Sequence, residues 1–115
     1  MIYQPNYWKI LKITKGDRTV YKVLAHWFGD LEFHDAQWRL NSGITKIQFN
    51  KEFNLYEIYG KSGSVYHCLA TNEHMSGYMI GLLEGFEYKL NSECSDIQLE
   101  VINIEDIKNE DWYCK

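Results

Sequence analysis

The chain has 115 residues, of which 16% are aromatic and 24% charged, and its formal net charge is −4. This length fits one domain with one hydrophobic core, and no apolar run approaches the roughly 18 residues that a membrane-spanning helix needs. The N-terminus lacks the charged start and apolar core of a secretory signal, so we expect one globular domain over residues 1–115 in the cytoplasm.

Cysteine usage argues against a disulfide framework and against a zinc site. Cys68, Cys94 and Cys114 are odd in number, widely separated and without a CxxC pair, whereas both kinds of site have recognisable cysteine spacings. We expect three free thiols, with Cys68 in the core because it sits in an apolar run.

Charge is distributed unevenly along the chain. Residues 1–51 carry eight basic and four acidic residues, whereas residues 52–115 carry four basic and twelve acidic ones. Two interpretations stay open. Either the molecule has two faces of opposite sign that steer a charged partner, or the two halves neutralise each other in space.

The first predicted elements are two strands that form a hairpin. Residues 7–14 and 19–27 are rich in β-branched and aromatic residues, which favour strands. Between them, Lys15 to Arg18 form a turn in which Gly16 can adopt a positive φ. An irregular, acidic loop follows at residues 28–36.

The centre of the chain is predicted to form further short antiparallel strands. They are separated by turns rich in Asn, Gly and Ser, two of which are the polar turns at residues 41–43 and 61–64. The strands are expected at residues 38–40, 44–49, 55–59 and 65–69.

The hydrophobic period changes after Thr71 and predicts a helix over about residues 72–90. Gly77, Gly81 and Gly85 form a row on this helix, and we expect them to let it lie close to the sheet. An alternative ends the helix near Gly85 and makes residues 86–90 a strand. The predicted apolar face consists of Met75, Tyr78, Met79, Leu82, Leu83, Phe86 and Leu90.

A last strand is predicted at residues 97–104, and Trp112 and Tyr113 are expected to pack on the body or to meet a partner. The order of elements predicts an α+β fold. We expect a strongly twisted or partly closed antiparallel sheet of about six strands, with one helix packed on one face.

No recognised catalytic or cofactor-binding pattern is present. The chain has no P-loop, GxGxxG, HExxH, GxSxG or EF-hand pattern. His67 and Cys68 point to opposite sides of their strand and therefore cannot act together as base and nucleophile. A site made of His26, His34 and a nearby aspartate would lack any metal-ligand spacing. We therefore predict no enzyme activity, no metal and no cofactor.

Aromatic and polar residues of the central strands predict a binding surface. Tyr, Trp and Arg dominate protein-interface hot spots, and aromatic side chains with a few polar groups also line small-molecule pockets. The predicted binding residues are Trp38, Arg39, Asn41, Tyr59, Ser62, Ser64 and Tyr66.

The leading hypothesis is a small non-enzymatic protein that occludes or sequesters a partner protein, as inhibitors, immunity proteins and phage counter-defence proteins do. The acidic half of the chain would face a basic surface of that partner. The protein itself is expected to be a monomer or a homodimer, without contact to a membrane.

Two other binding functions remain as alternatives. One is a small molecule or nucleotide bound near Trp38 and Tyr66, where Arg39 would pair with a phosphate or carboxylate. The other is single-stranded nucleic acid bound on the N-terminal hairpin through Trp8, Tyr21 and the neighbouring lysines. The acidity of the chain disfavours the second alternative, because a phosphate backbone is repelled by negative charge.

Overall fold

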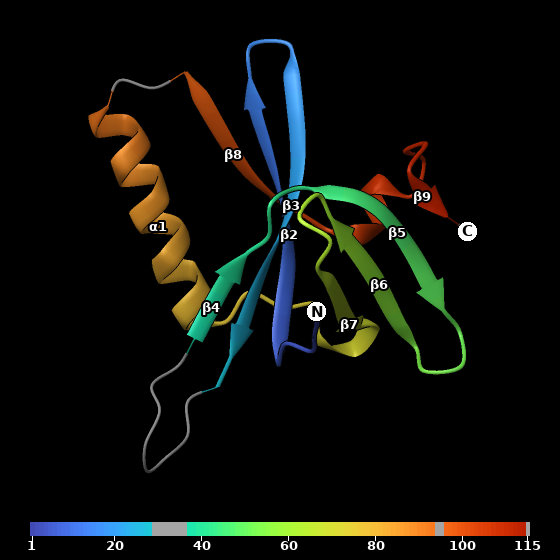
Figure 1. Cartoon of the computed structure of the whole chain (residues 1–115). Helices are drawn as coiled ribbons and strands as arrows, with labels where there is room; N and C mark the ends of the chain where they lie inside the picture. Colours follow the sequence, from blue (N-terminus) through green and yellow to red (C-terminus); the bar gives the residue numbers. More distant parts are fainter. Residues whose placement is uncertain (29–36, 94–95, 115) are drawn as a thin grey trace.

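The computed structural model describes residues 1–28, 37–93 and 96–114, whose strands form two sheets with one helix outside them (Figure 1). Among these residues, no helix is long and apolar enough to cross a membrane. The strands are β1 (Ile2–Tyr3), β2 (Tyr7–Lys15), β3 (Arg18–Trp27), β4 (Gln37–Leu40), β5 (Ile44–Asn50), β6 (Leu55–Gly60), β7 (Val65–Leu69), β8 (Ile97–Ile102) and β9 (Tyr113–Cys114). The helix is α1 (Gly77–Ser92), and two 3-10 turns are η1 (Ala70–Asn72) and η2 (Ile104–Ile107).

The fold is α+β, as predicted, but the strands form two open sheets instead of one. Sheet A has five strands in the order β1-β7-β6-β5-β9, and its two-residue edge strands run parallel to their neighbours. Sheet B has four antiparallel strands in the order β4-β3-β2-β8. The chain leaves sheet B after Leu40 and enters sheet A at Ile44, with Gly43 at a φ of +132° between them. This left-handed backbone turns the chain from one sheet into the other.

The predicted N-terminal hairpin is confirmed. Strands β2 and β3 pair along their whole length, from Tyr7 opposite His26 to Lys15 opposite Arg18. Gly16 occupies the first central position of the two-residue turn with a φ of +62°, as expected for a type II′ turn. Strand β8 pairs with the other side of β2, so β2 is an inner strand of sheet B.

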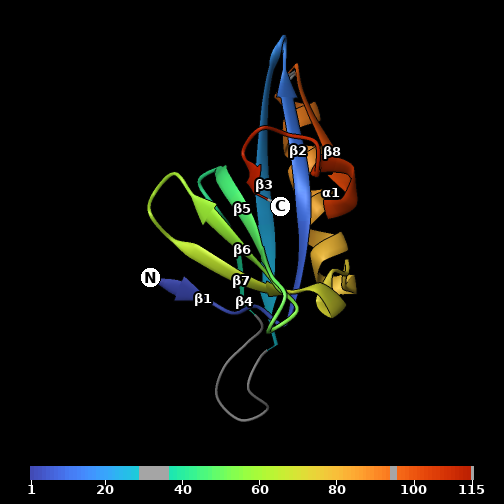
Figure 2. The ribbon, with the colours of Figure 1, turned by 90° about the vertical axis from the view of Figure 1, so that its right-hand side faces the viewer.

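Sheet B is buried on both faces, and this gives the molecule three layers (Figures 1 and 2). On one face, Leu11 and Leu24 pack with Met79 of α1. On the opposite face, side chains of β2 and β3 such as Ile10 and Val23 join the larger core formed with sheet A. Consecutive apolar residues on a strand thus serve two different cores.

Several contacts fasten the layers to one another. The Trp8 indole nitrogen donates a hydrogen bond of 2.8 Å across the core to the carbonyl of Leu69. Cys68 is fully buried, and desolvation raises the pKa of its thiol well above the ordinary value. Tyr113 is 8% exposed and Trp112 packs on the same core, which confirms that the C-terminal aromatics pack on the body. Cys68 and Cys114 are free thiols, and Cys94 lies outside the described residues.

Helix α1 continues to Ser92, so the longer of the two predicted helices is confirmed, but it begins later than expected. The side chain of Ser76 caps the helix by accepting a hydrogen bond from the backbone nitrogen of Met79. Residues 70–72 form η1 instead. The residue that fits the helical period before Ser76, Met75, packs against the smaller core without being helical.

The prediction that the glycine row lies against the sheet is wrong. A Cβ atom added to Gly77, Gly81 or Gly85 would meet nothing within 4 Å, so the row faces away from the body. The side chains that bury α1 lie on the other side of the helix, as Met79 and Leu82 show. A helix places residues four apart in one row, and the sequence alone does not say which row faces inward.

His26 is a buried polar group beside the start of α1. Its side chain is 5% exposed, and Nδ1 lies 2.9 Å from the Ser76 hydroxyl. The imidazole stacks on the ring of Tyr78 at a centroid distance of 4.5 Å. Desolvation in this setting lowers the pKa of His26 from its ordinary value of 6.5.

We expect Gly81→Ala and Gly85→Ala each to raise the free energy of unfolding by about 1 kcal/mol, because alanine fits a helix better than glycine and finds open space here. Urea unfolding measures this change. Gly60→Ala is the matched control and should destabilise, because its Cβ would lie 3.2 Å from the Asn41 amide nitrogen and 3.4 Å from the Ser42 hydroxyl. Destabilisation by either helix substitution would contradict the exposed position of the row.

Acidification should weaken the fold through His26. Since its pKa is lower in the folded chain than in the unfolded chain, the unfolded state binds the proton more readily, and stability falls as the pH drops below about 6.5. The free energy of unfolding, measured between about pH 7 and about pH 5.5, should therefore depend less on pH in His26→Gln than in the wild type. Equal slopes in His26→Gln and the wild type would exclude His26 as the cause.

Candidate functional site

The seven residues predicted to bind a partner or ligand lie at four separate places in the structure. Trp38 lies beside α1, Arg39 and Tyr66 share an aromatic cluster, and Tyr59 lies on the outer face of sheet A. The remaining three, Asn41, Ser62 and Ser64, lie where two turns meet.

Trp38 and Arg39 point to opposite faces of β4, because neighbouring residues of a strand alternate. The Trp38 ring is 42% exposed and lies 5.5 Å from the ring of Phe86 on α1. The Arg39 guanidinium lies 4.7 Å above the ring of Tyr3, which itself contacts Tyr66 at 5.0 Å. Burial raises the pKa of the Tyr66 hydroxyl, and the charge of Arg39 acts in the opposite direction. Tyr3 was missed from the sequence because it precedes the first recognisable strand.

Asn41 joins the end of β4 to β3. It is 5% exposed, and its Oδ1 accepts a hydrogen bond of 2.8 Å from the backbone nitrogen of Val23. Its own backbone nitrogen donates to the Val23 carbonyl at 3.1 Å. These contacts make Asn41 part of the framework of sheet B.

The two polar turns singled out in the sequence meet in space. The backbone nitrogen of Ser62 donates to the hydroxyl of Ser42 at 3.0 Å, and that of Lys61 donates to the Gly43 carbonyl at 2.9 Å. Ser64 takes part through its carbonyl, which accepts from Gly60 at 2.9 Å. The serines of the second turn therefore contribute backbone groups to this junction.

Tyr59 lies on the face of sheet A that no other element of the described chain covers. The ammonium group of Lys46 lies 5.2 Å from the centre of its ring. Lys46 is directly opposite Tyr59 in the register of β5 and β6, so the contact is a cross-strand cation–π pair.

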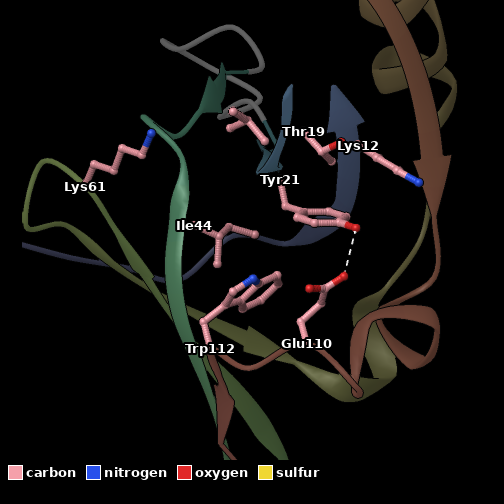
Figure 3. Close-up of a pocket in the computed structure, with 8 residues that line it drawn as sticks. Lys12, Thr19, Tyr21, Ile44, Lys61, Glu110 and Trp112 are labelled. Atoms are coloured by element: carbon pink, nitrogen blue, oxygen red, sulfur yellow. Dashed lines mark hydrogen bonds between the residues drawn. The ribbon is translucent and has the colours of Figure 1, made fainter. Parts of the chain in front are cut away.

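The β2–β3 hairpin extends past sheet A (Figure 2). A cleft opens there between the two sheets (Figure 3). Its volume is about 330 Å³. This inter-sheet cleft is lined by Lys12, Thr19, Val20, Tyr21, Ile44, Lys61, Glu110 and Trp112.

Tyr21 holds the C-terminal segment at one wall of the inter-sheet cleft. Its hydroxyl donates a hydrogen bond of 3.2 Å to Glu110, and its ring lies 5.4 Å from that of Trp112 (Figure 3). Burial raises the pKa of Tyr21, and the charge of Glu110 raises it further. Lys12 and Lys61 lie on opposite sides of the opening (Figure 3). The cleft therefore offers aromatic surface and ammonium groups, whose charge Glu110 partly offsets.

The outer side of α1 and β8 is acidic. Residues 77–102 contain five acidic residues and only one basic residue, Lys89, and their net charge of −4 equals that of the whole chain. The flank also exposes apolar surface, since Ile80 is 45% and Tyr88 77% exposed. We define the acidic flank by four exposed acidic residues, Glu84, Glu87, Glu93 and Asp96. The fifth, Glu100, is opposite Lys12 and lies on the side of sheet B that faces the inter-sheet cleft.

Metal binding gains no candidate site from the structure. Within the described ranges, no three His, Cys, Asp or Glu side chains are close enough together to hold a metal ion. The combination considered from the sequence includes His34, which lies outside the described residues, as do Asp30 and Asp35.

Comparison with known proteins adds no relative. No family model, curated protein or solved structure matches the chain. Inference about function therefore rests on the surfaces of this chain alone.

We expect Asn41→Ala to lower the free energy of unfolding by about 1–3 kcal/mol, because it leaves the buried backbone nitrogen of Val23 without an acceptor. Ser62→Ala is the control and should change stability by less than about 0.5 kcal/mol, since Ser62 is exposed and its interaction uses the backbone. Thermal and urea unfolding measure both effects. Unchanged stability of Asn41→Ala would contradict the structural role of Asn41 and would make it a candidate ligand contact again.

Proposed function

We propose that this chain is a non-enzymatic binding protein that occludes or sequesters a partner protein with a basic surface, and that the acidic flank makes the contact. The observation that carries the proposal is the position of the net charge. All of it resides on α1, β8 and the segment between them, next to exposed apolar side chains.

The rest of the chain is electrically balanced. Outside residues 77–102 there are eleven acidic and eleven basic residues. Some of these neutralise each other directly, as Lys9 and Glu73 do at 3.2 Å and Lys108 and Glu105 do at 2.8 Å. A neutral body with one acidic flank orients an approaching basic partner toward that flank.

The exposed apolar residues support contact with a protein surface. Tyr88 extends from α1 with most of its area in solvent, and Ile80, which is 45% exposed, directly precedes Gly81 on the same helix. Protein interfaces typically have aromatic and aliphatic side chains at their centre and polar or charged residues around them. The flank thus combines attraction at long range with apolar area at contact.

The nucleic acid alternative draws less support from the geometry. Trp8 is completely buried, so its ring has no face for base stacking. The lysines of the hairpin are also divided between its faces: Lys22 is opposite Leu11 and Lys12 is opposite Tyr21, which lie on different sides of sheet B. They do not form one basic surface.

The small-molecule alternative would now use the inter-sheet cleft. Lys61 belongs to the predicted turn and lines that cleft, but Arg39 and Tyr66 do not. Glu110 offsets part of the positive charge of the two lysines around the opening. The cleft therefore gives weaker grounds for a charged ligand than the flank gives for a basic protein.

The proposal is tested with the partner captured from the host by the immobilised wild-type protein. We expect Glu84→Lys combined with Glu87→Lys to slow association by about tenfold or more, because it removes the electrostatic attraction of the flank. The salt dependence of the association rate should shrink in the same variant. Biolayer interferometry at several ionic strengths measures both.

The matched control is Glu52→Lys combined with Asp111→Lys, which changes the net charge equally at two exposed turns next to strands of sheet A, outside the flank. It should retain most of the wild-type association rate. If both double variants slow association equally, net charge rather than the flank is responsible. If neither does, the acidic flank is not the binding surface.

A further inference from the structure

Strand β8 presents an uncovered edge of sheet B. Within the described part of the chain, it pairs with β2 and with no second strand. It is six residues long, and its residues from Gln98 to Ile102 are exposed or half-buried. Soluble proteins usually keep such edge strands very short, place charged residues on them or cover them with another element. Otherwise the free backbone groups of the edge readily pair with another strand.

The register shows which backbone groups face outward. The residues that flank a two-residue hairpin turn form a hydrogen-bonded pair, so Lys15 directs its backbone groups to β3 and Lys12 directs its groups to β8. Lys12 is opposite Glu100, and Glu100 therefore bonds inward. By alternation, the backbone groups of Leu99 and Val101 point away from β2.

Two other hydrogen bonds agree with this assignment of inward-facing and outward-facing backbone groups. The carbonyl of Trp8 lies on the β8 side of β2 and accepts from the backbone nitrogen of His74 at 3.0 Å. The carbonyl of Val23 lies on the β4 side of β3 and accepts from Asn41 at 3.1 Å. Both residues have the orientation that the hairpin turn requires.

A groove runs beside this edge, between β8 and the C-terminal half of α1. Its volume is about 390 Å³. Leu90 and Leu99 give it apolar surface, and Glu87 contributes a negative charge. The complete lining is Glu87, Leu90, Asn91, Ile97, Gln98 and Leu99.

We propose that an extended, basic segment of the partner binds by adding a strand to the outer edge of β8. Main-chain hydrogen bonds to Leu99 and Val101 would hold the segment, and alternate side chains would enter the groove beside α1. The inference rests on the proposed function, because the charge of the occupant follows from the acidic flank: Glu87, Glu93 and Asp96 are all close to the groove in sequence or in its lining.

A second copy of this chain is a poorer occupant of the same edge. Pairing β8 with β8 of another copy would bring two acidic flanks together, and like charges in contact cost free energy. A basic segment gains attraction at the same place. The negative charge of the flank therefore favours a basic segment over a second copy of the chain.

The probe is a nine-residue peptide of alternating lysine and valine, blocked at both ends, titrated into the ¹⁵N-labelled full chain. We expect the largest amide shifts at Leu99 and Val101 and slower hydrogen exchange at both, by about tenfold or more. A peptide in which proline replaces each valine keeps the charge but cannot pair as a strand, and it should leave the exchange rates of both amides unchanged.

The matched variants are Leu99→Pro and Leu99→Ala. Both shorten the side chain in the groove, but only proline removes the outward N–H, and edge strands tolerate it because the bonds to β2 remain. We expect Leu99→Pro to weaken peptide binding by about tenfold relative to Leu99→Ala. If the proline variant does not fold, the exchange of Leu99 and Val101 in the wild type decides alone.

Several results would overturn the inference. Equal affinities of Leu99→Pro and Leu99→Ala would exclude pairing at the edge, as would amide shifts confined to the exposed face of α1. In that second case, loss of binding in the Glu84→Lys and Glu87→Lys double variant would leave the proposed function intact. Concentration-dependent self-association that the peptide displaces would instead assign the edge to a second copy.

Discussion

The structure depends on one constraint: the part of sheet B that lies between sheet A and α1 has to bury both of its faces. Strands β2 and β3 place apolar residues at consecutive positions, as Ile10 and Leu11 do, and these point in opposite directions. A two-layer domain would leave one of them in water. Sheet A covers one face and α1 covers the other, so the three layers follow from the apolar residues of a single hairpin.

The same constraint explains why the two ends of sheet B differ. The hairpin of β2 and β3 extends past sheet A (Figures 1 and 2), and there the residues facing sheet A become polar, as Lys12 and Thr19 do. The C-terminal segment partly fills the opening, because Tyr21 contacts Trp112 and binds Glu110. The inter-sheet cleft is the space that remains between this segment and the turn at Lys61.

Local signals predicted individual elements better than their assembly. The hairpin was predictable because Gly16 sits at the position where a type II′ turn needs a positive φ. The division into two sheets was not, since it depends on Gly43 and on long-range pairing of β4 with β3. Tyr3 was not predicted to take part in the site because it lies in a strand of two residues, which is too short to produce a recognisable pattern. The seven predicted binding residues were expected on one surface, but the structure brings together only Arg39 with Tyr66, and Asn41 with the serines of the second turn.

The outward side of α1 combines features that folding alone does not explain. Gly81 and Gly85 there lower helix stability by about 1 kcal/mol each relative to alanine, and nothing in the described chain approaches them closely. The neighbouring strand β8 pairs with only one other strand of the described chain, and most of the acidic residues of the segment 77–102 lie on the same side. Each feature alone has ordinary explanations, such as tolerance of glycine at a surface. Together they place a less stable helix surface, an edge strand and negative charge on one side of the molecule, which is the arrangement that the proposed contact with a basic partner requires.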